Sequence, residues 1–346
     1  MSEVLRQAPV VPESFQRVVL ASRPLSRPSV EHFRVETVET PSIADGQVLV
    51  RNRYLSIDPY MLGRMFDARS YATPHPLGEA MIGETVGKIV ATRHPRLVVG
   101  DTVVGPLGWQ ELAVSDGGNL DKINDADIGL STYLGAIGMT GITAWYGMHQ
   151  ICEPRPGETV VVSGAAGAVG SVAVQLARER GCRVIGIAGG RLKCDTVIRE
   201  FGVAACVDYR GAPDAAALQG AIAHLAPNGV DAFFDNVNGM TLDAVLPLMK
   251  PFGRIALCGM IARYGQQPMT LSNHGFLLLS RLRAQGFIVY DHRPLWPQAR
   301  AELAALVCAG RLKVLETVSE GIASAPAACI GLIEGKNLGK QIVKLY

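Results

Sequence analysis

The stretch that decides the fold is Val160-Val161-Val162-Ser163-Gly164-Ala165-Ala166-Gly167-Ala168-Val169-Gly170-Ser171. Its first four residues form an apolar run without alternation, which is typical of a parallel strand buried on both faces. From Ser171 to Arg180 the apolar residues have helical spacing, and Gly181 follows as a stop. A further strand is predicted at 183–188. A strand, a glycine loop, a helix and a second strand predict a dinucleotide site, where small residues let the backbone approach a pyrophosphate.

The rest of the chain shows two different patterns of apolar and polar residues. Downstream, strand-like runs alternate with helical segments at 205–207, 230–234 and 254–257. This alternation predicts an α/β fold with a Rossmann-type, doubly wound parallel sheet. Upstream, short strand-like runs at 47–54 and 82–90 and a strand pair around a Gly-Asp turn at 98–105 indicate an antiparallel, barrel-like domain.

The sequence pattern changes near residue 133 and again near residue 303. From about 303 the tail is predicted to form a helix and then a strand at 341–345. We therefore predict a nucleotide-binding domain at 133–302. The second domain is predicted to combine residues 1–132 with 303–346.

Composition excludes several classes of protein. The 346 residues carry 33 Lys+Arg against 31 Asp+Glu, and 48% are hydrophobic, so the chain is neither disordered nor a dedicated nucleic-acid binder. The uncharged stretches at 128–152 and 159–177 are broken by glycines, so we expect no membrane helix. The seven cysteines form no C-x-x-C pair and no apolar signal segment opens the chain, which favours a cytoplasmic protein with reduced thiols.

The end of the second strand distinguishes the cofactors. An NAD site usually carries an acid there for the ribose 2′-OH, whereas this chain has Arg191 and Lys193 and no acid. Two cations favour a 2′-phosphate, and therefore NADPH/NADP. The alternative is that both are solvated charges that open a helix, but cations are unfavourable at a helix N-terminus.

Six blocks in order resemble those of zinc-independent medium-chain dehydrogenases/reductases, in the branch of prostaglandin and leukotriene reductases, plant alkenal double-bond reductases and bacterial curcumin reductases. The blocks are 53–61, 138–145, 167–171, 234–237, 285–289 and 334–337. The resemblance runs from about residue 15 to the end. It implies a GroES-like β-barrel, made by the N-terminal part and the tail, closed over the NADPH-binding domain.

The resemblance also implies the cofactor contacts. Gly167, Ala168, Val169 and Gly170 match the pyrophosphate loop. Lys193 and Tyr209 match the pair that holds the adenosine 2′-phosphate, with Gly190 beside them, and Asn337 matches a residue that reaches the cofactor from the other domain. The other implied contacts are Met139, Thr140, Gly141, Asn236, Cys258, Gly259, Met260, Ile261, Tyr264, Phe287, Ile288 and Val289. Arg263 and Asn238 depart from the family, and Arg263 leaves the substrate preference open.

The sequence predicts no metal site. Zinc-dependent relatives need Cys and His ligands and a Cys-rich lobe. This chain has no cysteine before Cys152, its histidines are scattered, and Ile82-Gly83-Glu84 stands where a zinc enzyme has Gly-His-Glu.

A metal-free site favours reduction of a conjugated C=C over that of a simple carbonyl, because hydride addition at the β-carbon moves charge to the enone oxygen. The resemblance therefore implies NADPH-dependent reduction of α,β-unsaturated ketones and aldehydes, with Tyr264 and Tyr54 in the active-site cleft. From the residues alone Tyr54 could be core, since it shares a strand face with Val48 and Val50.

Two alternatives stay open: a quinone or carbonyl reductase on the same fold, and a non-catalytic NADPH-binding protein. The expected partner is a small-molecule enone or alkenal, with no nucleic acid and no membrane. We also expect a homodimer, as is common in the family, with the apolar strands of 230–257 extending a sheet across a two-fold axis.

Overall fold

The computed structural model describes residues 11–68, 70–123, 128–262 and 270–346. The chain forms two compact units. Unit 1 contains Met1–Leu134, Val318–Leu332 and Gln341–Tyr346, and unit 2 contains Gly135–Thr317 and Ile333–Lys340. Among the helices described, none combines the length and the apolar character that a membrane crossing requires.

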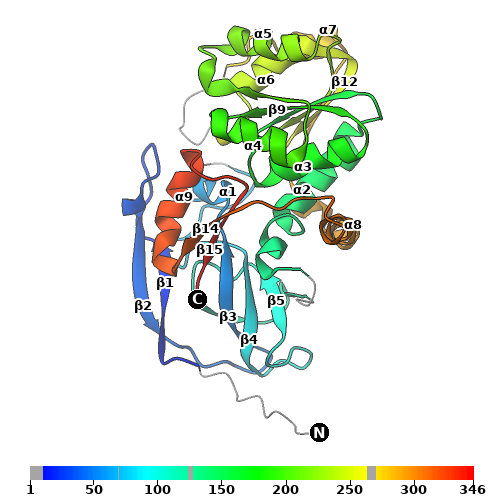
Figure 1. Cartoon of the computed structure of the whole chain (residues 1–346). Helices are drawn as coiled ribbons and strands as arrows, with labels where there is room; N and C mark the ends of the chain where they lie inside the picture. Colours follow the sequence, from blue (N-terminus) through cyan, green and yellow to red (C-terminus); the bar gives the residue numbers. More distant parts are fainter. Residues whose placement is uncertain (1–10, 69, 124–127, 263–269) are drawn as a thin grey trace. The chain divides into compact units, whose positions relative to one another are not determined.

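The elements follow one another as labelled in Figure 1. The strands are β1 Ser14–Leu20, β2 Phe33–Glu39, β3 Val48–Ser56, β4 Thr85–Thr92, β5 Thr102–Gly105, β6 Leu112–Ser115, β7 Asp121–Lys122, β8 Thr159–Ser163, β9 Arg183–Ala188, β10 Ala205–Asp208, β11 Val230–Asp235, β12 Met249–Leu257, β13 Arg283–Gly286, β14 Glu316–Glu320 and β15 Lys340–Lys344. The α-helices are α1 Tyr60–Gly63, α2 Met139–Tyr146, α3 Ala168–Glu179, α4 Arg191–Phe201, α5 Ala215–Leu225, α6 Met240–Val245, α7 Phe276–Leu279, α8 Trp296–Cys308 and α9 Ala325–Ile333.

Unit 2 is built on a six-stranded sheet with the order β10-β9-β8-β11-β12-β13. Every neighbouring pair is parallel, which confirms the predicted doubly wound parallel sheet. Helices α3 and α4 cover one face and α5 and α6 the other (Figure 1). Because both faces are covered, all five residues of β8 are buried, as its unbroken apolar run predicted.

Side chains that alternate along the strands form the core under α5 and α6. Val161, Ile185, Phe233 and Ile255 come from four neighbouring strands and are essentially inaccessible to solvent. They pack with Leu218 and other apolar residues of the helices in one cluster. This packing holds the strand ends in fixed register, so the loops that leave them are positioned by the core.

Unit 1 is β-rich, as expected. Its larger sheet has the order β14-β15-β3-β4-β5-β7. Strand β6 also pairs with β3, along residues 48–51, whereas β15 pairs with residues 54–56. The pairing of β3 with β4 is antiparallel, and register shifts occur between Leu49 and Val50 and between Asn52 and Tyr54. At the second shift the extra residue is Arg53 of β3, and this bulge breaks the simple alternation from which Tyr54 was placed on the face of Val48 and Val50.

The strand pair predicted at 98–105 is only half correct. Thr102–Gly105 forms β5, but Val98 and Val99 are exposed in a turn. The Asp101 carboxylate accepts a hydrogen bond from the Val98 amide at 3.0 Å, and the Val98 carbonyl accepts one from the Asp101 amide. This local closure satisfies the backbone without a ladder, so β-branched residues occupy a turn.

The expectation that strands within 230–257 form the free sheet edge is wrong. β11 lies between β8 and β12, and β12 is covered in turn by β13. The outer strand is the short β13, whose four residues Arg283–Gly286 are all exposed.

Candidate active site

The predicted cofactor residues of unit 2 gather at the carboxyl ends of its parallel strands. The chain runs outward from β8 through β9 to β10, and then returns to β11 on the other side of β8. The ends of β8 and β11 therefore flank the point where the strand order reverses. In open α/β sheets ligands bind in the crevice at this point.

A buried carboxylate organises this point. Asp235, the last residue of β11, is inaccessible to solvent and accepts hydrogen bonds from the Ser163 hydroxyl at 2.6 Å and from the amides of Val237 and Asn238. Burial raises the pKa of Asp235, and the hydrogen bonds from Ser163 and the backbone oppose that rise. Among the described residues no cation donates a hydrogen bond to Asp235, so the loop after β11 must fold around the carboxylate for it to stay buried.

Asn236 is fixed by the same arrangement. Its amide donates to the Ser163 hydroxyl at 2.8 Å, and its side-chain Nδ2 donates to the Ser163 carbonyl at 2.7 Å. The side chain thus lies against the glycine loop that leaves β8. Its place beside the cofactor, which the family resemblance implies, stays a prediction.

The glycine loop ends at Gly167, the N-cap of α3, which begins at Ala168. The helix therefore starts earlier than the predicted Ser171. No side chain caps this end, so the first amides of α3, among them Val169, have neither a cap nor an intrahelical acceptor. A Cβ on Gly170 would lie 2.1 Å from the Gly164 carbonyl oxygen, so only glycine lets the helix approach the loop this closely. These amides are suited to a phosphate.

The tail contributes to this loop from within the same unit. The Gly339 amide donates to the Ala166 carbonyl at 2.8 Å, and Gly167 and Gly339 form a parallel bridge. Asn337, buried nearby in sequence, donates from Nδ2 to the Gly339 carbonyl at 2.9 Å. Asn337 was expected to reach the cofactor from the other domain, whereas residues 333–340 cluster with unit 2 itself.

Two cations, Lys193 and Arg210, lie where β9 passes into α4. Gly190, the N-cap of α4, has φ +95° and donates its amide to Asp208 Oδ1 at 2.7 Å. The same oxygen accepts the amide of Arg210, which places Arg210 at this corner. Burial, and then the charge of Arg210, lower the pKa of Lys193. Within the described residues no carboxylate pairs with Lys193 or with the Arg210 guanidinium, so the corner is suited to an anion.

The structure distinguishes Arg191 from Lys193, the two cations to which the sequence assigned the same role. The Arg191 side chain is 94% exposed and makes an ion pair with Asp195 at 3.6 Å, one helical turn away. Arg191 is therefore a solvated helix charge, and the phosphate interpretation fits Lys193 alone. The Tyr209 ring borders the same corner, since a Cβ on Gly189 would lie 2.9 Å from its Cε1.

The segment after β12 is attached to the same network. The amides of Cys258 and Gly259 donate to the Asp235 carbonyl, at 2.8 and 3.2 Å. The following Met260 and Ile261 are partly exposed, at 45% and 38%. Tyr264 and Arg263 lie outside the described residues, so the catalytic role predicted for Tyr264 stays a prediction.

Two further predicted segments also belong to unit 2. Met139, Thr140 and Gly141 open α2, where Thr140 is buried and its hydroxyl donates to the Gly135 carbonyl at 3.0 Å. After β13, Phe287 packs against Tyr146 and Phe234. It is followed by the half-buried Ile288 and the buried Val289.

Tyr54 belongs to unit 1, where it is half-buried on β3 between its neighbours in β4 and β15. Its catalytic role stays a prediction. Among the described residues no three His, Cys, Asp or Glu side chains converge in a way that could hold a metal ion.

Three residues at this edge escaped the sequence analysis. Ser163 was assigned only to a strand, Asp235 only to the family block 234–237, and Arg210 was not singled out. The sequence did carry a signal that could have found them. Each of the three residues stands at or just after the end of a predicted parallel strand, and the carboxyl ends of such strands meet at one edge of the sheet.

Comparisons with known proteins place the chain in a family. Residues 16–123 match the family described as "N-terminal domain of oxidoreductase", and residues 168–305 match "Zinc-binding dehydrogenase". The chain is 38% identical over 342 residues to the NADPH-dependent curcumin reductase of Escherichia coli, which covers 95% of this chain and 96% of that protein. It is 41% identical over 299 residues to the NADP(+)-dependent 2-alkenal reductase of Nicotiana tabacum, covering 86% of each.

A solved structure agrees with both. The crystal structure of CurA from Vibrio vulnificus in complex with NADPH is 39% identical, covers 96% of this chain and 99% of its own, and superposes with a TM-score of 0.88. The chain therefore belongs to the medium-chain dehydrogenase/reductase family, in the branch of the prostaglandin reductases, alkenal reductases and curcumin reductases.

Proposed function

We propose that this chain is an NADPH-dependent reductase of the conjugated C=C in α,β-unsaturated ketones and aldehydes. The observation that carries the proposal is the pair Lys193 and Arg210, two cations without a carboxylate partner in the described chain, beside Gly190. The names of the curcumin and 2-alkenal reductases support the same cofactor and substrate class.

The residues present fit NADPH. Uncapped amides at the start of α3, with Gly167 and Gly170, would hold the pyrophosphate. Lys193, Arg210 and Tyr209 would hold the 2′-phosphate. Asn236 and Asn337, with the segments 139–141, 258–261 and 287–289, are proposed to line the remaining length of the cofactor. When bound, NADPH supplies the hydride.

The task left to the protein is to hold the enone oxygen while it gains negative charge. A neutral tyrosine hydroxyl donates a hydrogen bond to such an oxygen without needing a shifted pKa. We propose Tyr264 for this donation and Tyr54 for the wall of the substrate site, both on the family resemblance.

We also propose a homodimer formed through the edge of the unit-2 sheet. β13 is the outermost strand beyond β12. Helix α7 directly precedes β13 in the chain, and its side chains Leu278 and Leu279 are 80% and 65% exposed. An exposed strand beside apolar side chains favours pairing with a second copy across a two-fold axis.

A cytoplasmic location is proposed from the thiols. All seven cysteines are free, and four are buried: Cys152, Cys182, Cys194 and Cys329. Free buried thiols fit a reducing compartment. Recovery of the chain outside the cytoplasm on cell fractionation would contradict this.

The function is tested by steady-state oxidation of NADPH with a simple enone, a quinone and a saturated aldehyde. We expect turnover with the enone to exceed that with the other two, and to be unchanged after exhaustive chelation. Preference for the quinone or the aldehyde would favour the carbonyl and quinone reductase alternative. Tight NADPH binding without turnover on any substrate would favour a non-catalytic protein.

The phosphate corner is tested by KM for the two cofactors. Lys193→Ala and Arg210→Ala should each raise KM for NADPH roughly ten- to hundredfold, because a charge-assisted hydrogen bond is worth about 1.5–3 kcal/mol. KM for NADH should change little. Arg191→Ala is the matched control, since its side chain is 94% exposed and paired with Asp195, and it should behave as wild type. Equal losses with NADPH and NADH would place the two cations elsewhere.

The tyrosines are tested by single-turnover hydride transfer from NADPH to an enone. Tyr264→Phe should lower kcat on the order of tenfold with little change in KM, less than the roughly 10²–10³ of a lost oxyanion donor, because water can donate instead. Tyr54→Phe should change KM more than kcat. Wild-type rates in Tyr264→Phe would remove this residue from the chemistry.

The dimer is tested by light scattering. The wild type should have twice the 36.9 kDa of the chain. Leu278→Glu combined with Leu279→Glu should shift the mass toward that of the monomer, because burying two carboxylates in an apolar contact is unfavourable. Leu25→Glu, at a position 97% exposed in unit 1, is the control and should leave the mass unchanged. A monomeric wild type at all concentrations would reject the proposal.

A further inference from the structure

The tail of the chain passes directly beside the corner that Lys193 and Arg210 form. Helix α9 ends at Ile333, and the next two residues, Glu334 and Gly335, form a turn. The Glu334 carbonyl accepts a hydrogen bond from Arg210 Nη2 at 3.2 Å, across a separation of 124 residues in the sequence. Both sides of this contact belong to unit 2. The tail therefore holds one end of the Arg210 guanidinium.

Backbone without side chains surrounds this guanidinium. A Cβ built on Gly189 would lie 3.1 Å from Arg210 Nε, and one built on Gly190 would lie 3.8 Å from Nη1. On the tail side, a Cβ on Gly335 would lie 3.1 Å from Nη2. Larger residues at these positions would crowd the edges of the guanidinium, from which its N–H groups donate.

The Cβ position of Gly335 is also close to the second cation of the corner. It would lie 3.7 Å from Lys193 Nζ, as well as 3.1 Å from Arg210 Nη2. At such distances one anionic oxygen could accept a hydrogen bond from Arg210 and pair with the Lys193 ammonium. Because glycine has no side chain, no atom of Gly335 occupies this point between the two cations.

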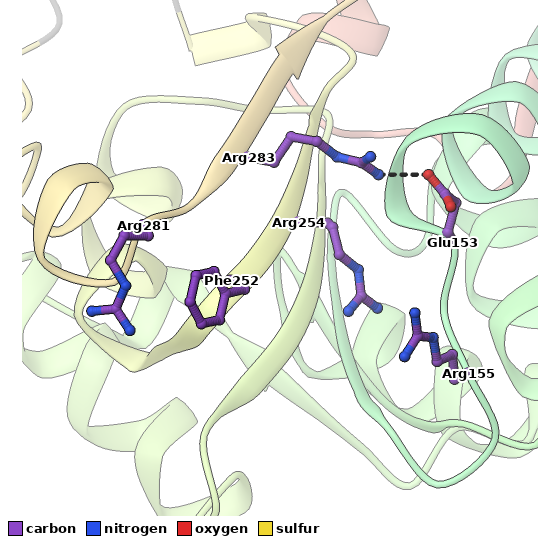
Figure 2. Close-up of a pocket in the computed structure, with 6 residues that line it drawn as sticks. All are labelled: Glu153, Arg155, Phe252, Arg254, Arg281 and Arg283. Carbon is purple, nitrogen blue, oxygen red and sulfur yellow. Dashed lines mark hydrogen bonds and ion pairs between the residues drawn. The ribbon is translucent and has the colours of Figure 1, made fainter.

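Two of the arginines in Figure 2 show how the chain neutralises cations elsewhere in unit 2. They lie toward the amino ends of the strands, away from the proposed cofactor residues. Arg283 donates to Glu153 at 2.6 Å (Figure 2), and Arg254 donates to both carboxylate oxygens of Glu158. Each of these two guanidinium groups therefore has a carboxylate of the chain as its partner.

The corner differs, although the tail turn carries an acid. The Glu334 carboxylate pairs with Lys336 at 2.7 Å, and only its backbone carbonyl meets Arg210. Within the described residues no carboxylate pairs with Lys193 or with the Arg210 guanidinium. Two positive charges thus share a point that the chain itself leaves without a negative group, which favours an anion from outside the chain.

Gly335 also serves as an ordinary helix stop. Its φ is +67°, the conformation that glycine commonly provides just past the end of a helix. Gly310 has the same place after α8, with φ +66°, but a Cβ built on Gly310 would meet nothing within 4 Å. The helix end accounts for the positive φ of both glycines. The two cations beside the Cβ position are found at Gly335 and not at Gly310.

We infer that Gly335 is a specificity-determining residue for the phosphorylated cofactor, because the point beside its Cα receives an oxygen of the 2′-phosphate. That oxygen is held between Arg210 Nη2 and Lys193 Nζ, while the Glu334 carbonyl keeps the guanidinium in place. Two cations match the charge of a phosphate dianion. This role of Gly335 rests on the proposed binding of NADPH, and it adds the tail to the residues that select NADPH over NADH.

The test compares binding of adenosine 2′,5′-bisphosphate and adenosine 5′-monophosphate to the full chain by titration calorimetry, which requires no turnover. Wild type should bind the bisphosphate about tenfold or more tightly than the monophosphate. Gly335→Ala should lose most of this preference, because its methyl group takes the place of the oxygen and crowds Arg210. Its binding of the monophosphate should stay unchanged. KM should rise about tenfold for NADPH and stay unchanged for NADH.

Gly335→Asp tests the same point with a charge. Its carboxylate would lie beside both cations and take the place of the phosphate, so this variant should bind the two nucleotides with about equal affinity. Asp tolerates positive φ better than Ala does, so Gly335→Asp should fold even if Gly335→Ala does not. A wild-type preference for the bisphosphate in Gly335→Asp would contradict the role of Gly335.

Gly310→Ala is the matched control, because it introduces the same strain at a helix end with no cation beside it. It should lower the melting temperature about as much as Gly335→Ala and keep the wild-type preference for the bisphosphate. An unchanged preference in Gly335→Ala, or an equal loss in Gly310→Ala, would overturn the role of Gly335 and leave the proposed function standing. Equal binding of both nucleotides by the wild type would contradict the NADPH site itself, and the role of Gly335 with it.

Discussion

A carboxylate that is buried with no cation bonded to it in the described part of the chain imposes a strict condition on the protein around it. The Asp235 side chain is removed from water, so every hydrogen bond that water would have given it must come from the chain. A hydroxyl from the neighbouring strand and amides of its own loop supply them. The backbone after β11 is thereby folded tightly back toward β8, at the point where the strand order reverses.

Other parts of the cofactor edge depend on this condition. Ser163, which donates to Asp235, also accepts the amide of Asn236, so one hydroxyl connects two strand ends. The Asp235 carbonyl accepts the amides that start the segment after β12. Three consecutive strand ends of the sheet are thus joined by hydrogen bonds that leave little freedom. A separate carboxylate, Asp208, has the equivalent role at the corner between β9 and α4, where one oxygen accepts the amides of both Gly190 and Arg210.

The sequence predicted the parts of this arrangement that have local causes. The buried apolar run, the glycine loop and the helix stop each follow from spacing along a few residues, so the parallel sheet was predictable. The different fates of Arg191 and Lys193 were not, because one lies on the solvent side of α4 beside Asp195 and the other faces the corner. An apolar pattern could not predict β13, because this strand is short and polar. Since β13 pairs with β12, the strands within 230–257 do not form the edge of the sheet. The register shifts between β3 and β4 likewise depend on how two strands that are separate in the sequence pair with each other. Tyr264 lies outside the described residues, and the roles of both tyrosines rest on family resemblance.

The bond between the Gly339 amide and the Ala166 carbonyl has a consequence for how the molecule comes into being. A contact between residues 166 and 339 closes a loop that contains half the chain, and the entropy of that closure must be met before the contact can form. During synthesis from the N-terminus, the glycine loop is complete long before its partner leaves the ribosome. One side of the glycine loop of unit 2 therefore stays uncovered until residue 339, far downstream in the chain, has been synthesised.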